Sequence, residues 1–413
     1  MHGAQRCIMP LQHPGSGRYS SISCNPLTST GEFLFQFELE FLSSRTTGMD
    51  VGAVFSFQQM GDRREDGAVW RENLRLADMV EPLGLDGIWS TEHHFTDYQV
   101  APSPTQFLSY MAGRTSRVKL GSCATILPWH DPVRVAEEYS LLDILSNGRA
   151  IMGIGRGLGH VEFDGFRVPM SEARDRFVEG ARIVMDALET GNLSAKGNHY
   201  PIPDRHLRPH PERSFRERTY AAAVSPESFD AVIELGLGLM CVVQKPWEIV
   251  QNDFANYRER FLAKHARPAP KSLAVAFVYC DNDAERAKDH AEEYIERYYN
   301  ITMEHYNLTG EHFANTPGYE YYAKGAKTMK KAGDGGAARF FRELQVYGTP
   351  KQCIEKIMHI ADVIDADMFA ANISYGGLPA EAAEASLRLF AREVAPRLKA
   401  ASRSKAESSA VSV

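Results

Sequence analysis

The sequence lacks the features that mark membrane-spanning, disulfide-stabilised and nucleic-acid-binding proteins. Its 413 residues contain no apolar run of about 18, so we expect no membrane span. A net charge of −7 leaves no broad basic face, which disfavours nucleic acid as a partner. The six cysteines show no CxxC spacing; they are Cys7, Cys24, Cys123, Cys241, Cys280 and Cys353. This pattern fits neither a disulfide framework nor a zinc site, and it is typical of a reducing compartment, so we predict a cytoplasmic protein.

Two catalytic motifs are also missing. No G-x-S-x-G segment occurs, which disfavours a serine hydrolase. The glycine-rich run GIGRGLG at 153–159 superficially resembles a dinucleotide fingerprint, but G-x-G-x-x-G would need glycine at position 158, where leucine stands. We therefore reject Rossmann-type dinucleotide binding.

The composition that remains, 44% hydrophobic and 24% charged, is that of a globular protein with ample core. Residues 1–48 differ from the rest because they are rich in Ser, Pro and Gly and open without apolar periodicity. Met49 stands directly before the buried-type run 50–57. We expect 1–48 to be a disordered extension or sequence translated from a wrongly chosen start, 49–400 to be the folded domain, and 401–413 to be a disordered tail.

From Met49 onward, strand-like and helix-like segments alternate. The expected strands are 50–57, 87–89, 118–127, 149–155, 219–224, 237–243, 272–280 and 367–373. The expected helices are 69–83, 104–116, 132–146, 171–190, one opening at 225–228, 246–264, 350–362 and 379–399. About eight such units predict an α/β fold, a (β/α)₈ TIM barrel; an open doubly wound sheet is the alternative. An irregular stretch at 195–218 and a long helical insertion at 283–345 interrupt the alternation.

The segment DGIWSTEHHF at 86–95 places a carboxylate and two imidazoles after a buried strand. In parallel α/β folds, ligands bind at the carboxyl ends of strands. Histidine exchanges protons near neutral pH, so this strand end is a candidate catalytic site. The alternative is that one histidine only packs and the other only caps a loop.

Three further strand or helix ends predict a phosphate site. Arg156 projects from the glycine-rich loop, and Arg174 lies early in the helix at 171–190. Ser225 and Ser228 supply hydroxyls at a helix start, where free N–H groups favour anions. Because an arginine fork suits phosphate, we predict a phosphorylated cofactor here.

We expect no metal. His93 and His94 are neighbours whose side chains point to opposite sides, so they would not chelate one ion together. His160 and Glu162 do not form a ligand set, nor do the histidines of the Pro-rich segment, which are His199, His206 and His210.

Several spaced motifs together resemble the bacterial luciferase-like flavin-dependent monooxygenases. They are TEHHF at 91–95, GSCATILPWHDPVRVAEEYSLLDILSNGR at 121–149, GIGRG at 153–157, YGTPKQCIEKI at 347–357 and VAPRLK at 394–399. The resemblance runs in register from about residue 49 to 399. It implies a (β/α)₈ barrel that uses reduced FMN and O₂ to oxygenate a small apolar organic substrate through a C4a-hydroperoxyflavin.

By this resemblance, His93 matches the catalytic histidine beside the flavin. Glu92 and His94 flank it in supporting or interface roles, and Glu92 is counted among the cofactor-binding positions. Cys123 and Ala124 match the pair joined by a non-prolyl cis peptide under the flavin ring. The remaining cofactor-binding positions are Arg156, Gly157, Arg174, Ser225 and Ser228, and residues 318–334 match the mobile active-site loop. The resemblance also implies a separate NAD(P)H:flavin reductase as partner and a homodimer packed through the helices at 104–116 and 132–146.

The chain departs from the light-emitting catalytic subunit at two positions. Gly155 stands where that subunit has cysteine, and Val224 stands where it has glutamate, which argues against light emission. Two rival functions stay open: an F420-dependent oxidoreductase of the same fold, and a non-catalytic flavin-binding subunit. The substrate depends on the loops at 195–218 and 283–345, which vary freely on a shared barrel.

Overall fold

The computed structural model describes residues 48–60, 65–332 and 334–400. Within them, eight parallel strands close into a barrel, and every strand is hydrogen-bonded to two neighbours. The barrel strands are β1 (Asp50–Phe55), β2 (Gly87–Ser90), β3 (Lys119–Ser122), β5 (Ala150–Gly155), β8 (Thr219–Ala222), β9 (Gly238–Val242), β10 (Ser272–Cys280) and β12 (Ala366–Asn372). Closure through β9 and β10 confirms the predicted (β/α)₈ fold and rules out the open sheet. Residues 1–47 of the predicted extension 1–48, and the whole predicted tail 401–413, lie outside the described residues.

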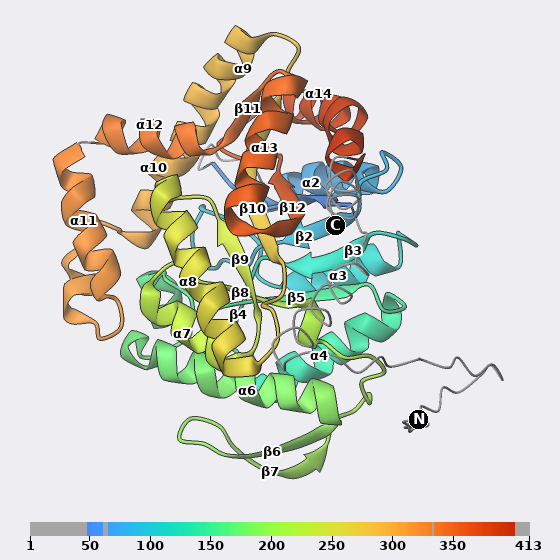
Figure 1. The fold of residues 1–413 in the computed structure, drawn as a ribbon, viewed down its shortest axis with the longest axis vertical. Coiled ribbons are helices and arrows are strands. Elements are labelled where there is room, and N and C mark those ends of the chain that lie inside the picture. The colour runs from blue at the N-terminus through green and yellow to red at the C-terminus, as the bar shows by residue number, and fades with distance from the viewer. Residues whose placement is uncertain (1–47, 61–64, 333, 401–413) are drawn as a thin grey trace, which may run out of the picture. The chain divides into compact units, whose positions relative to one another are not determined.

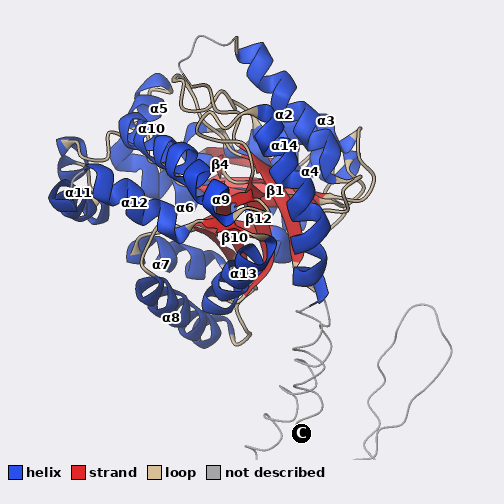
Figure 2. Cartoon of the chain, turned by 90° about the horizontal axis from the view of Figure 1, so that it is seen from above, coloured by secondary structure: helices blue, strands red, loops and turns tan. Residues whose placement is uncertain are grey.

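One helix follows each strand and packs on the outside of the barrel (Figures 1 and 2). These helices are α2 (Asp66–Val80), α3 (Pro104–Ala112), α4 (Pro132–Leu145), α6 (Ala173–Thr190), α7 (Pro226–Leu235), α8 (Trp247–His265), α13 (Pro350–Ile364) and α14 (Ala380–Leu389). Four of them begin with proline directly after a capping side chain, supplied by Ser103, Asp131, Ser225 and Thr349. A cap oxygen satisfies a free N–H of the first turn, and proline is preset for the helix, so these starts are encoded locally.

The barrel interior is filled by side chains that alternate with outward-facing ones along the strands. The inner cluster includes Val54, Trp89, Ile151, Tyr220, Met240, Leu273 and Met368. A Cβ at Gly121 would lie 2.2 Å from the ring of Trp89, so glycine is required there for the tryptophan to fill the centre. The barrel is therefore packed along its length, and the site must lie at one mouth.

Three predicted segments are wrong in detail. The expected continuous strand 118–127 divides into β3 and β4 (Thr125–Ile126), because the chain turns at Cys123–Ala124. The stretch predicted as irregular contains an antiparallel hairpin, β6 (Asn192–Lys196) and β7 (Pro201–His206). The helix expected over 104–116 also ends earlier, at Ala112.

The predicted helical insertion is confirmed between β10 and α13. It comprises α9 (Ala284–His290), a π-helical turn (Ala291–Ile295), α10 (Glu296–Tyr306), a 3₁₀ turn (Glu311–Asn315), α11 (Glu320–Ala332), α12 (Asp334–Leu344) and the short strand β11 (Val346–Gly348). The helices α10, α11 and α12 lie together on one side of the barrel (Figure 1). Because β10 delivers them at its carboxyl end, their side chains reach the same mouth as the TEHHF segment.

Candidate functional site at the carboxyl mouth of the barrel

The predicted site residues follow the carboxyl ends of neighbouring strands. His93 follows β2, Cys123 follows β3, Arg156 follows β5 and Ser225 follows β8, while Arg174 lies in the first turn of α6. These strands are adjacent in the barrel in the order β2, β3, β5, β8. The fold therefore brings together, at one mouth, residues that lie up to more than 130 positions apart in the sequence.

His93 and His94 do point to different partners, as predicted. Nδ1 of His93 lies 2.9 Å from Oε1 of Glu162, while Nε2 of His94 lies 3.1 Å from Oε1 of Glu92. The ring of His93 also packs edge-on against Tyr98 and Tyr306, with centroids 4.7 and 5.9 Å away. The His93 imidazole thus packs against two aromatic rings and lies beside a carboxylate.

Glu92 is fully engaged within the protein. It is only 1% exposed, and it accepts hydrogen bonds from Nε2 of His130 at 2.6 Å and from the backbone N–H of Ile126 at 2.9 Å. Burial raises the pKa of Glu92, but the bonds from His130 and His94 outweigh burial and lower it overall. The arrangement supports the predicted supporting role, and its contact with a cofactor stays a prediction.

The Cys123–Ala124 peptide bond is cis, as the resemblance implied. It lies between β3 and β4, and burial raises the pKa of the Cys123 thiol to about 12. The thiol is therefore protonated at neutral pH and is not a thiolate nucleophile.

Arg156 and Arg174 converge on one oxygen. Their guanidinium groups donate to the backbone carbonyl of Gly318 at 2.8 and 3.2 Å. Tyr319 stacks on Arg156, with the guanidinium carbon 4.1 Å from the ring centroid, and its hydroxyl donates to the carbonyl of Gly157 at 3.0 Å. Two cations aimed at one acceptor form a ready anion site.

Ser225 and Ser228 lie together at the start of α7. Their hydroxyl oxygens are 2.9 Å apart, and Ser225 Oγ accepts the backbone N–H of Ser228 at 3.3 Å. Because β8 pairs with β5, this helix start is next to the strand that carries Arg156. Ser225 therefore caps α7, and a phosphate contact stays a prediction.

Glu162 and His305 also belong to the site, although no sequence motif marks them as site residues. Glu162 lies in α5 (His160–Gly165), and His305 lies near the end of α10, with its Nε2 3.4 Å from Oε2 of Glu162. Ligand atoms of His93, Glu162 and His305 fall within 4.8 Å of one another. The direct 2.9 Å contact between His93 and Glu162 is that of a hydrogen bond, so we interpret the cluster as a proton-holding network.

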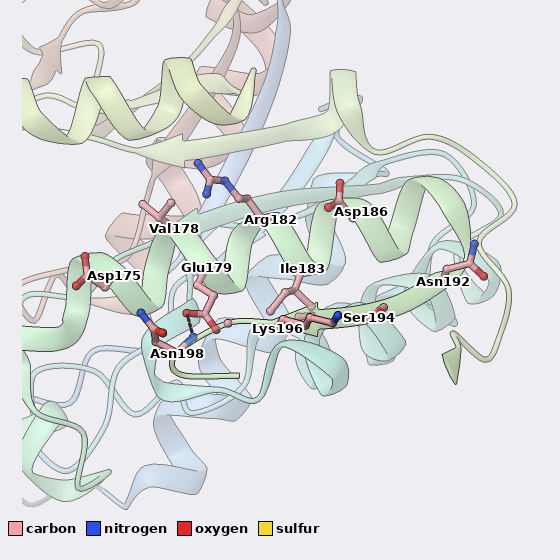
Figure 3. A pocket seen from close by; sticks show the side chains of 12 residues that line it. Asp175, Val178, Glu179, Arg182, Ile183, Asp186, Asn192, Ser194, Lys196 and Asn198 are labelled. Carbon is pink, nitrogen blue, oxygen red and sulfur yellow. Dashed lines mark hydrogen bonds between the residues drawn. The ribbon is translucent and has the colours of Figure 1, made fainter. Parts of the chain in front are cut away.

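An open pocket of about 440 Å³ lies elsewhere, between α6 and the β6–β7 hairpin (Figure 3). Its carboxylate Glu179 accepts backbone N–H groups of the loop 198–200, including that of Tyr200 at 2.7 Å. The pocket is lined by none of the predicted site residues. Glu179 therefore ties the hairpin loop to α6.

A closed parallel barrel carries an imidazole, two convergent arginines and a cis peptide at its carboxyl mouth, the end at which enzymes of this fold hold their active sites. Residues 49–366 match the family model described as luciferase-like monooxygenase. The chain belongs to this family. Family membership supports an oxidoreductase of monooxygenase type.

The chain is similar to the alkanal monooxygenase alpha chain of Photobacterium leiognathi, with 27% identity over 353 residues, 84% of this chain and 97% of that protein. Among solved structures, it resembles monooxygenase RslO1 from Streptomyces bottropensis, with 24% identity, a TM-score of 0.68, and coverage of 84% and 99% of the two chains.

Two further structures share the fold with different cofactors. The oxygenating constituent of 3,6-diketocamphane monooxygenase from Pseudomonas putida, in complex with FMN, is 18% identical with a TM-score of 0.64, covering 85% of this chain and 98% of that one. An F420-dependent secondary alcohol dehydrogenase is 15% identical with a TM-score of 0.63, covering 85% and 99%. At these identities the likeness supports the fold alone. No helix among the described residues is long and apolar enough to cross a membrane.

Proposed function

We propose that the chain is a flavin-dependent monooxygenase that uses reduced FMN and O₂ to oxygenate a small apolar organic substrate. The observation that carries the proposal is the convergence of Arg156 and Arg174 on one oxygen, at the barrel mouth that also holds His93. One mouth thus offers both a place for an anionic group and a side chain that exchanges protons. That is the arrangement a phosphorylated redox cofactor requires.

The residues at the mouth fit FMN. The carbonyl oxygen of Gly318 occupies a position between two guanidinium groups that a phosphate oxygen would suit better, because it carries full negative charge. Ser225 and Ser228 would add hydroxyl and N–H donors from the start of α7. Cys123 and Ala124 would support the ring system. When bound, reduced flavin would supply the electrons that activate O₂, with one oxygen atom going to substrate and the other to water.

His93 is the proposed catalytic residue, as proton donor and acceptor beside the flavin. Its ring stands among Tyr98, Tyr306 and His305, with centroid distances between 4.7 and 5.9 Å. Aromatic neighbours keep water away, which protects a reactive oxygen species from wasteful decay. The insertion 283–345, which supplies Tyr306 and His305, would serve as the cover of the site.

The test is oxygen consumption with NADH, FMN and a separate flavin reductase, followed by analysis for oxygenated product. His93→Ala should keep FMN affinity within about twofold and abolish product formation, because the histidine acts on protons and does not grip phosphate. Undiminished product formation by His93→Ala would contradict the assignment. F420 reduction without oxygen uptake would favour the deazaflavin rival, and no turnover with either reductant would favour a non-catalytic subunit.

We also propose a homodimer through α3 and α4. Apolar side chains that are exposed on these helices are Tyr110, Leu141, Ile144 and Leu145. α3 and α4 pack beside each other, so the exposed side chains come from adjacent helices. Sedimentation of a Leu141→Glu, Leu145→Glu double variant tests this: a monomer is expected, and an unchanged dimer would place the interface elsewhere.

A further inference from the structure

Glu162 stands at the centre of a polar cluster for which the proposed function gives no role. Its side chain is completely buried, and Oε1 lies 2.9 Å from Nδ1 of His93. The same oxygen accepts the backbone N–H of His94 at 3.0 Å. One carboxylate oxygen therefore holds both the His93 ring and the backbone that carries it.

The charge of Glu162 decides which nitrogen of His93 bears the proton. Burial raises the pKa of Glu162, but the charge and hydrogen bonding of His93 and His305 outweigh burial and leave it at about 2. At neutral pH the carboxylate is ionised and can only accept. Nδ1 of His93 must then donate, which leaves Nε2 with a free lone pair in the neutral ring.

Tyr306 stands at that lone pair. Its hydroxyl oxygen is 3.4 Å from Nε2 of His93. Burial holds the pKa of Tyr306 well above its ordinary value, so the hydroxyl keeps its proton. The two nitrogens of His93 thus face opposite kinds of group: an acceptor at Nδ1 and a neutral hydroxyl at Nε2.

His305 joins Glu162 to the insertion. Its Nε2 lies 3.4 Å from Oε2 of Glu162, and its Nδ1 lies 2.7 Å from Oγ1 of Thr96. Burial lowers the pKa of His305, so this ring is neutral near pH 7. Among the titratable groups that face His93, which are Tyr98, Glu162, His305 and Tyr306, the carboxylate is the one that is ionised at neutral pH.

We propose that Glu162 is the positioning residue of His93: it holds the ring in the Nδ1–H form and leaves Nε2 as the atom that takes and returns the catalytic proton. The assignment of Nε2 as the atom that moves the catalytic proton, which is the catalytic half of the proposal, rests on the proposed function. The assignment of the Nδ1–H tautomer does not. Carboxylate–imidazole pairs of this kind orient a general base without touching substrate.

The tautomer is measured on the full chain without flavin, by long-range proton–nitrogen NMR of ¹⁵N-histidine-labelled protein. The His93 signals are assigned by their loss in His93→Gln. Wild type should show Nδ1–H at pH 8, and Glu162→Gln should give a mixture of both tautomers, because the amide that replaces the carboxylate can donate as well as accept. An unmixed Nδ1–H form in folded Glu162→Gln would overturn the proposal.

Glu92→Gln is the matched control. It removes an equally buried carboxylate at the same mouth, which bonds His94 and His130 and makes no contact with Nδ1 of His93. The His93 tautomer should stay as in wild type. If Glu162→Gln does not fold, Glu162→Asp replaces it: the shorter side chain withdraws from Nδ1, and a mixture of both tautomers is expected. An unmixed Nδ1–H form there would overturn the proposal.

Turnover with reduced FMN separates positioning from simple structural support. Glu162→Gln should lower kcat by at least about tenfold, with FMN affinity within twofold. Glu179→Gln, at the distant hairpin, should leave kcat unchanged. If wild type shows the Nδ1–H form but no oxygenase activity, the proposed function fails and the tautomer assignment stands; mixed tautomers with a normal kcat in Glu162→Gln would refute the catalytic half.

Discussion

Glu92→Ala should lower the free energy of unfolding by about 3–5 kcal/mol, the range seen when one partner of a buried ion pair is removed. The carboxylate is 1% exposed and accepts from Nε2 of His94, Nε2 of His130 and the N–H of Ile126, at 3.1, 2.6 and 2.9 Å. Alanine would leave three donors facing a cavity. Each donor that loses a charged partner in the interior costs about 1.5–3 kcal/mol, and relaxation and water entry reduce the sum to the stated range.

The size of this effect should depend on pH in a defined direction. The pKa of Glu92 is lowered below 4.5, so its contribution is present above pH 4.5 and is lost as the pH falls through the folded-state value. Burial lowers the pKa of His130, but Glu92 outweighs burial and raises it above 6.5 overall. The contribution of His130 is therefore present below pH 6.5 and lost as the pH rises through its raised value. The difference between wild type and variant should be largest between pH 4.5 and 6.5.

Urea unfolding followed by tryptophan fluorescence, at pH 4, 5.5 and 8, measures this. Glu137→Ala is the control, because its ion pair with Arg134 is exposed and should contribute less than about 1 kcal/mol. A Glu92→Ala variant within 1 kcal/mol of wild type at pH 5.5 would refute the reasoning. A difference in unfolding free energy between wild type and Glu92→Ala that grows steadily from pH 5.5 to 8 would refute it as well.

Three other predictions follow from single contacts. Arg156→Ala should weaken FMN binding about 10- to 100-fold in a flavin-fluorescence titration, since it removes a charge-assisted phosphate contact, and unchanged affinity would move the phosphate site elsewhere. Gly153→Ala should lower the free energy of unfolding by at least about 2 kcal/mol in urea titration, because the new Cβ would lie 2.0 Å from the carbonyl oxygen of Ser122. The control Gly325→Ala should not destabilise the protein, because nothing lies within 4 Å of its new Cβ. Tyr139→Phe should cost about 1–2 kcal/mol and lower the Tm, because its buried hydroxyl lies 2.6 Å from Oγ of Ser122; an unchanged Tm would contradict that bond.

The barrel could be predicted from sequence because its strands and helix starts are encoded locally. Buried runs such as 150–155 and 272–280 are long and apolar, and helices such as α4 and α13 open with a capping side chain followed by proline. The hairpin 192–206 could not be predicted in the same way, because Pro201 and Pro203 and the mostly exposed faces of its strands remove the alternation that marks a half-buried strand.

The site was predictable only where a motif carried it. His93, Arg156 and the Cys123–Ala124 pair lie in distinctive segments next to strand ends, and the cis bond between the last two is present. Glu162 lies 69 positions from His93, and its spacing to His160 indicated only that the two do not chelate together. His305 belongs to the insertion, whose place over the mouth is set by tertiary packing and not by any local pattern.

The central claim is that one mouth of the barrel holds the flavin between His93 and the arginine pair. A crystal structure of the chain soaked with FMN tests it most directly. We expect the phosphate between Arg156 and Arg174, in the place of the Gly318 carbonyl, and the ring system against the Cys123–Ala124 bond with His93 beside it. Flavin bound at another surface, or at this mouth with its phosphate away from both arginines, would contradict the account.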